Sequence, residues 1–176
     1  MPDPDRNRPF LPVGIAVVTV SDTRTPADDR SGDVLTARIE AAGHHLAARH
    51  IVPDDRGRLH TCLSELIGRE DVAVIITTGG TGITGRDITP EVVEALYDKA
   101  IPGFGELFRM LSYNTIGTST IQSRVTGGLA GDTLIFALPG STGAVKDGWD
   151  GILASQLDNR HRPCNFVELM PRFRER

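Results

Sequence analysis

The sequence has 176 residues, of which 39% are hydrophobic and 24% are charged, values that favour one globular domain over a disordered chain or a membrane protein. Its formal net charge of -4 argues against a general nucleic-acid-binding protein, which normally carries a basic face, so we expect no nucleic-acid partner and no membrane. The two cysteines are too few for a zinc cage or a disulfide framework and fit a reducing cytoplasm, and the five histidines show no zinc-type spacing.

The two ends of the chain differ in composition from the rest. Residues 1–12 contain four prolines and no apolar run typical of a signal peptide or a membrane anchor, so we interpret them as a flexible arm. One α/β domain is expected over residues 13–160, followed by a C-terminal tail at 161–176. Five arginines stand from Arg160 onward, and a solvated tail or a subunit contact explains them better than an RNA-binding segment.

Strands and helices are expected to alternate along the domain. Short β-branched runs predict buried strands, whereas apolar residues at a spacing of three or four predict amphipathic helices. In chain order the pattern predicts a strand at 14–21, a helix at 31–42, a strand at 45–52, a helix at 59–67, a strand at 71–78, a helix at 90–97, a helix within 101–112, a strand at 133–138 and a helix at 141–157. This alternation predicts a mainly parallel sheet that helices cover on both faces.

Four segments of the chain follow predicted strands. In a parallel sheet, ligands bind where the carboxyl ends of the strands meet. We therefore expect these segments to converge on one rim of the sheet: residues 21–24, 53–55, 79–87 and 139–143.

The stretch "TTGGTGITGRDITPE", residues 77–91, is the most informative of them. Its glycines satisfy both the dinucleotide pattern G-x-G-x-x-G and the Walker spacing G-x-x-x-x-G. The Walker interpretation fails because Arg86 and Asp87 stand where Lys and Ser/Thr are required. The dinucleotide interpretation is weak, because the chain about 20 positions further on, where an acidic residue should hold a ribose hydroxyl, reads "IPGFGEL", a turn entering a helix. Closely spaced glycines ahead of a helix still suit a phosphate or another anion, although a tight turn without function is the alternative.

Polar residues at the other strand ends extend this hypothesis. Asp54 and Asp87 are placed to hold Mg²⁺ against bound phosphates, unless Asp87 caps a turn and Asp54 is solvated. Thr89 and Pro90 fit the N-cap and first positions of a helix. Ser141 either caps the last helix or touches the ligand, and "PGSTG" lacks the spacing of a nucleophile elbow. The apolar residues of "PGFGELFRML", Phe104, Phe108 and Met110, are expected in the core or an interface rather than against a heterocycle.

Several motifs together resemble the MoaB/MogA family of molybdenum cofactor biosynthesis proteins. They are "TTGGTGITGRDITPE", "IPGFGELFRMLS", "TSTIQSR" and "TLIFALPGSTGA", within a match that spans about residues 14–157, and "PGSTG" and "RPCNF" resemble the MoaB branch in particular. The resemblance implies a three-layer α/β/α fold with a mainly parallel sheet, a homotrimer or homohexamer, and binding of molybdopterin, a dithiolene pterin, at the rim. MogA-like members transfer AMP from Mg-ATP to the terminal phosphate of molybdopterin, and a partner protein then inserts molybdate.

The resemblance also implies roles for individual residues. Asp54 and Asp87 match the two acidic residues that serve the reaction in the family, so we expect both to be catalytic and to bind the metal. Substrate and phosphate binding is assigned to other residues of the rim: Ser21, Asp22, Gly79, Gly80, Thr81, Gly82, Thr89, Glu91, Pro139, Gly140 and Ser141. Ser141 and Thr142 replace the Asn-Pro or similar pair that is usual in MogA-like sequences. Two hypotheses therefore stand, a molybdopterin adenylyltransferase and a non-catalytic pterin-binding or partner-binding protein of the same fold.

Overall fold

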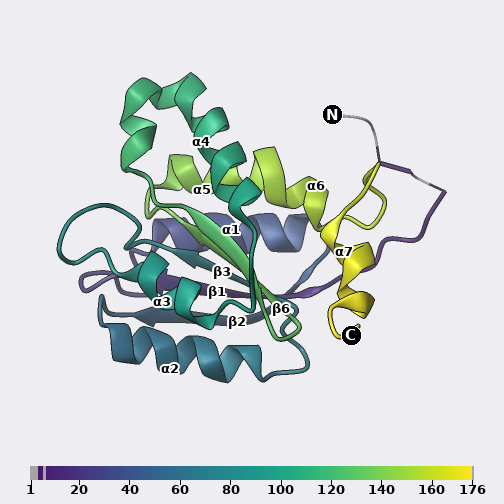
Figure 1. Cartoon of the computed structure of the whole chain (residues 1–176), viewed down its shortest axis with the longest axis horizontal. Helices are drawn as coiled ribbons and strands as arrows, with labels where there is room; N and C mark the ends of the chain where they lie inside the picture. The colour runs from purple at the N-terminus through teal and green to yellow at the C-terminus, as the bar shows by residue number, and fades with distance from the viewer. Residues whose placement is uncertain (1–3, 6, 176) are drawn as a thin grey trace.

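The computed structural model describes residues 4–5 and 7–175, which form a six-stranded sheet between two layers of helices (Figure 1). The strands lie in the order β2-β1-β3-β6-β5-β4. Their bounds are β1 Gly14–Val20, β2 His45–Val52, β3 Val74–Thr78, β4 Lys99–Ala100, β5 Thr126–Ala130 and β6 Thr133–Leu138. The helices are α1 Arg30–Ala41, α2 Arg56–Ile67, α3 Thr89–Leu96, α4 Pro102–Ile116, α5 Thr142–Gly148, α6 Ala154–Gln156 and α7 Phe166–Leu169, with short turns η1 Gly117–Gln122, η2 Trp149–Leu153 and η3 Met170–Arg172.

The expected three-layer fold with a mainly parallel sheet is confirmed. β2, β1, β3 and β6 are parallel neighbours, and β5 and β4 add an antiparallel edge that the sequence pattern did not predict. The glycines of β5 explain both the missed strand and its packing, because a Cβ at Gly128 would collide with the ring of Tyr97, and one at Gly127 would lie 2.9 Å from Phe136. Aromatic rings occupy the places that side chains normally fill on a strand.

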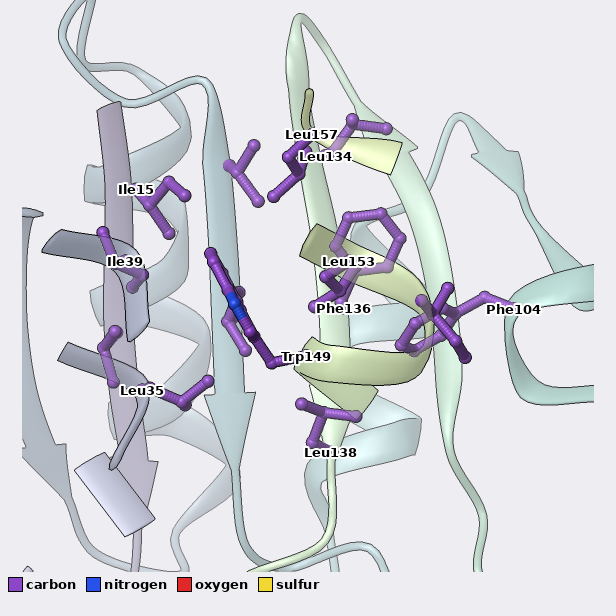
Figure 2. Close-up of a cluster of buried hydrophobic side chains, with 14 of the residues drawn as sticks. Ile15, Leu35, Ile39, Phe104, Leu134, Phe136, Leu138, Trp149, Leu153 and Leu157 are labelled. Atoms are coloured by element: carbon purple, nitrogen blue, oxygen red, sulfur yellow. The ribbon is translucent and has the colours of Figure 1, made fainter. Parts of the chain in front are cut away.

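Successive side chains of β1 point to opposite faces of the sheet and pack into two separate hydrophobic clusters. Ile15 and Val17 pack on the side of α1, α4 and α5, whereas Ala16 and Val18 pack on the side of α2 and α3. Figure 2 shows the first of these clusters around the ring of Trp149. The two expected core phenylalanines of α4 are buried there, but Met110 on the same helix is 61% exposed.

The expected continuous helix at 141–157 is interrupted. α5 is followed by the π-helical turn η2, and α6 ends at Gln156. The wider turn places Trp149, Ile152 and Leu153 on the buried face together. Periodicity alone did not reveal this interruption, because both kinds of helix bury one side.

The two ends of the chain lie against each other. Leu11 N donates to Asn159 Oδ1 at 2.9 Å, Asn159 Nδ2 donates to Pro9 O at 3.0 Å, and Arg8 pairs with Glu168. The part of the expected flexible arm that the structure describes is thus packed against the tail, and residues 1–3 and 6 lie outside the described residues. Of the five arginines from Arg160 onward, four pair with carboxylates of the chain, and Arg176 lies outside the described residues. No helix within the described residues is long and apolar enough to cross a membrane.

Candidate functional site

The four segments that follow strands do converge on one rim, as expected. Backbone hydrogen bonds join them in pairs, from Ser21 N to Val52 O at 2.8 Å and from Gly79 N to Leu138 O at 3.0 Å. The hydroxyl of Thr78 also donates to Pro139 O at 2.9 Å. The parallel order of β2, β1, β3 and β6 places all four loops at the same edge.

The start of the glycine loop needs glycine for conformational reasons. Gly79 and Gly80 have φ values of 104° and 63°, in the left-handed region that side chains rarely adopt. A Cβ at Gly79 would also collide with the carbonyl oxygen of Val20. The backbone of the loop therefore lies in direct contact with the backbone at the end of β1.

Thr89 holds this loop through hydrogen bonds instead of capping α3. The expected N-cap role is wrong: Thr89 is the first residue of the helix, and Ile88 precedes it without a side-chain cap. The buried hydroxyl of Thr89 donates to Gly79 O at 2.8 Å, and its backbone N–H donates to Gly80 O at 3.0 Å. The local sequence fits an N-cap, but the tertiary contact with the loop takes the hydroxyl.

Asp87 folds back onto the loop that precedes it. Its Oδ2 accepts hydrogen bonds from Thr84 N at 2.8 Å and from Thr84 Oγ1 at 2.6 Å. Burial raises the pKa of Asp87, but these bonds, a backbone bond from Gly82 and the charge of Arg124 outweigh it, so the pKa lies below its usual value. Asp87 thus stabilises a turn, as the alternative interpretation held, and it is an ionised group at the cavity described below.

Asp54 lies next to Asp22 and close to the start of the loop, because a Cβ at Gly80 would lie 3.3 Å from Asp54 Oδ1. The two residues bond reciprocally: Asp22 N donates to Asp54 Oδ2 at 3.0 Å, and Asp54 N donates to Asp22 Oδ1 at 3.1 Å. Burial raises the pKa of Asp54, and the neighbouring charges of Asp22 and Asp87 raise it further, against a backbone hydrogen bond and Arg86. A cation placed among these carboxylates would relieve that repulsion.

The donor set at the rim fits Mg²⁺ held together with phosphate. Carboxylate oxygens suit this ion, which normally takes one or two protein carboxylates and completes its shell with substrate phosphates and water. Among the residues that the structure describes, no group of three His, Cys, Asp or Glu side chains is arranged to hold a metal ion by itself. Asp54 and Asp87 are therefore candidate ligands only in combination with phosphate oxygens.

A cavity of about 300 Å³ opens beside the glycine loop, and Asp54 is not among the residues that line it. The glycine loop, the segment after β6, and the helices α4 and η1 form its walls. Its lining residues are Gly79, Gly80, Thr81, Gly82, Asp87, Phe108, Ser112, Ile116, Ser119, Gln122, Ser123, Pro139, Gly140, Ser141 and Ala144. Apart from the carboxylate of Asp87, the wall carries hydroxyl, amide and apolar groups, which suit a heterocycle with several donors and acceptors. The Ser123 hydroxyl oxygen is buried and has no hydrogen-bond partner within the described residues.

Arg124 holds the loop from the η1 side and was not singled out in the sequence. Its Nε donates to Gly82 O at 2.6 Å, its Nη2 donates to Asp87 O at 2.9 Å, and its third nitrogen pairs with Glu91. The predicted ligand residue Glu91 therefore faces Arg124. "TSTIQSR" marked the segment, but these contacts reach 33 to 42 positions along the chain and leave no local pattern.

Comparison with known proteins identifies the family. A sequence profile described as "Probable molybdopterin binding domain" matches residues 16–159. The chain belongs to the MoaB/MogA family of molybdenum cofactor biosynthesis proteins. Molybdenum cofactor biosynthesis protein B of Escherichia coli (strain K12) is 49% identical over 157 residues, covering 89% of this chain and 92% of the relative.

Two solved structures agree with this family assignment. A crystal structure of a molybdenum cofactor biosynthesis protein B has a TM-score of 0.86 and 38% identity, and the match covers 96% of this chain and 100% of that one. The tungsten cofactor synthesizing protein MoaB from Pyrococcus furiosus has a TM-score of 0.76 and 34% identity, covering 93% of this chain and 98% of that one. The fold and the rim described above are thus those of a MoaB/MogA family member.

The predicted site residues of this family member fall into three places. One group lines the cavity: Gly79, Gly80, Thr81, Gly82, Asp87, Pro139, Gly140 and Ser141. A second group, Ser21, Asp22 and Asp54, lies at the ends of β1 and β2. Thr89 and Glu91 line neither place, because the first is buried under the loop and the second pairs with Arg124.

Both interpretations of Ser141 have support in the geometry. Its hydroxyl caps α5 by accepting from Ala144 N at 3.2 Å, and the same residue lines the cavity. Ser141→Ala is expected to lower the free energy of unfolding by about 1 kcal/mol, as the loss of an N-cap does. Urea denaturation measures this, with Thr142→Ala as the control, and unchanged stability would show that the cap contributes nothing.

Proposed function

We propose that this chain binds molybdopterin in the cavity and transfers AMP to it from Mg-ATP. The molybdopterin-binding domain and the biosynthetic family support the first half of this proposal. One observation supports the second half: the glycine loop borders the cavity and lies close to both carboxylates, since a Cβ at Gly80 would lie 3.3 Å from Asp54 Oδ1 and one at Gly82 would lie 2.8 Å from Asp87 Oδ2. A pterin in the cavity and a nucleotide at the acidic pair would meet at this loop.

The reaction joins two phosphates. An oxygen of the terminal phosphate of molybdopterin attacks the α-phosphorus of ATP, a new P–O–P bond forms, and pyrophosphate leaves. No protein nucleophile is needed, so alignment of the two substrates and neutralisation of charge account for most of the rate. Asp54 and Asp87 would hold Mg²⁺, which supplies charge neutralisation at the phosphates. The hydroxyls of the cavity wall orient the pterin.

The decisive experiment incubates the purified protein with molybdopterin and Mg-ATP. Chromatography should detect adenylylated molybdopterin, with pyrophosphate released in equal amount. The product would then pass to a protein that inserts molybdate.

A non-catalytic binder of the same pathway is the second candidate. The observation that favours it is Ser141, which caps α5 and stands with Thr142 where MogA-like sequences usually carry another pair. Molybdopterin bound by the wild type without any transfer from ATP would establish this candidate and exclude the enzyme.

We also propose that the chain assembles into a homotrimer or homohexamer through α4 and η1. These elements expose large apolar side chains: Leu107, Met110, Tyr113, Ile116 and Ile121. Soluble monomers rarely leave such a cluster uncovered. Light scattering is expected to give at least three times the monomer mass, and Met110→Asp should lower that mass whereas Leu11→Asp, in the arm, should not. A dilute wild-type monomer would contradict the proposal.

A further inference from the structure

Two arginines accompany the glycine loop, and their surroundings differ. The Arg124 side chain is one-third exposed. It donates hydrogen bonds to Gly82 O and Asp87 O and pairs with the carboxylate of Glu91. Arg86 is 68% exposed, and within the described residues its only ion-pair and hydrogen-bond partner is Asp22. Arg124 is therefore committed to the protein, whereas Arg86 can change partner at little cost.

The backbone next to Arg86 is free of packing. A Cβ built at Gly85 would meet no atom within 4 Å, and Ile83 at the same loop tip is 68% exposed. Both neighbours of the loop tip are thus open to solvent, as is the Arg86 side chain itself. The guanidinium nevertheless starts within reach of the acidic pair, since its charge lowers the pKa of Asp54.

The position of Arg86 in the sequence is informative in itself. It directly follows the last glycine of the G-x-x-x-x-G spacing, where a Walker loop has the lysine that reaches the phosphates. The Walker motif as a whole is absent because Asp87 occupies the next position. A cation at the end of a glycine loop is the one part of that arrangement that remains.

A polyphosphate at this rim would meet negative charge that is already in place. Asp22, Asp54 and Asp87 place three carboxylates around the loop, and a polyphosphate would add more negative charge to the same region. A guanidinium binds phosphate oxygens through two parallel charge-assisted hydrogen bonds. An arginine that leaves one carboxylate for a phosphate keeps its charge paired in both states.

We propose that Arg86 binds the polyphosphate chain of the ligand at this rim and that Asp22 holds the guanidinium until the ligand arrives. The inference rests on the proposed function, which names Mg-ATP as the nucleotide that carries the polyphosphate. The chemistry is shared by the triphosphate of Mg-ATP and by the pyrophosphate that the reaction would release.

Isothermal calorimetry with Mg-ATP and, separately, with Mg-pyrophosphate tests this. Arg86→Ala is expected to weaken the binding of both ligands about ten- to a hundredfold, and Arg86→Lys to recover part of the loss. Arg69→Ala is the matched control, because it removes an exposed arginine from its ion pair with Asp71 away from the rim, and it should change neither affinity.

A stability measurement separates ligand binding from a structural role of the ion pair. Because the pair is exposed on the Arg86 side, Arg86→Ala should unfold at the same urea concentration as the wild type and keep its circular dichroism spectrum. If Arg86→Ala lost affinity only together with stability or secondary structure, the pair would be structural and the inference would be overturned.

The separate titrations with Mg-ATP and Mg-pyrophosphate distinguish a failure of this inference from a failure of the proposed adenylylation. If Arg86→Ala bound both ligands as tightly as the wild type, the inference would be overturned and the proposed function would remain intact. Arg86-dependent binding of pyrophosphate without any binding of ATP supports the inference and contradicts adenylylation. A wild type that binds neither ligand contradicts both.

Discussion

Replacing Asp87 with asparagine is expected to slow AMP transfer about a hundredfold or more while molybdopterin affinity stays appreciable. The wild-type carboxylate is ionised at neutral pH because its pKa lies below the usual value. Asparagine has the same size but no charge, so it removes the electrostatic contribution to the phosphates and the metal. Steady-state transfer assays and pterin titrations on the same preparations measure the two effects separately.

The loop itself should survive this substitution. An amide oxygen at position 87 can still accept from Thr84 N, and Arg124 still holds the backbone carbonyls of Gly82 and Asp87. Circular dichroism checks the fold independently. Asp71→Asn is the control, because Asp71 also has a lowered pKa next to an arginine, Arg69, but lies just ahead of β3, at the opposite end of that strand from the glycine loop. Transfer at the wild-type rate by Asp87→Asn would remove Asp87 from the proposed chemistry.

The convergence of the rim could be predicted because it depends only on strand direction. Once β1, β2, β3 and β6 are identified from their apolar runs and placed in a parallel sheet, their carboxyl ends must share one edge. Each strand in this set is marked by residues next to one another in sequence. That is why the amino-acid sequence alone suffices to place Asp54 and the glycine loop at the same edge.

The features that were missed depend on contacts between distant residues. Thr89 has the local signature of an N-cap, but a backbone oxygen of the loop ten positions earlier accepts its hydroxyl. β5 was not predicted, because the rings that pack on its glycines come from elsewhere in the chain: Tyr97 just after α3, Phe104 of α4 and Phe136 of β6. Arg124 looks like an ordinary basic residue until the loop is folded against it. Local patterns contain none of this information.

Gly82→Val is expected to weaken molybdopterin binding about ten- to a hundredfold, because it overfills the cavity. Gly82 lines the cavity, and a Cβ there would lie 2.8 Å from Asp87 Oδ2 and 3.1 Å from Asp87 Cγ. The two methyl groups of valine would therefore displace the carboxylate or occupy space that the pterin needs. Transfer of AMP should fall with binding, since both effects begin at the same atoms.

Gly85→Val is the matched control in the same loop. A Cβ at Gly85 meets no atom within 4 Å, and neither glycine has a positive φ, so the two substitutions differ in what the new side chain touches rather than in backbone strain. Pterin titration should show weakened binding for Gly82→Val and near wild-type binding for Gly85→Val. Equal losses in both would assign the effect to the flexibility of the loop. Unchanged affinity in both would mean that the glycines only form a turn, and the cavity would then have to bind its ligand through α4, η1 and the segment after β6 alone.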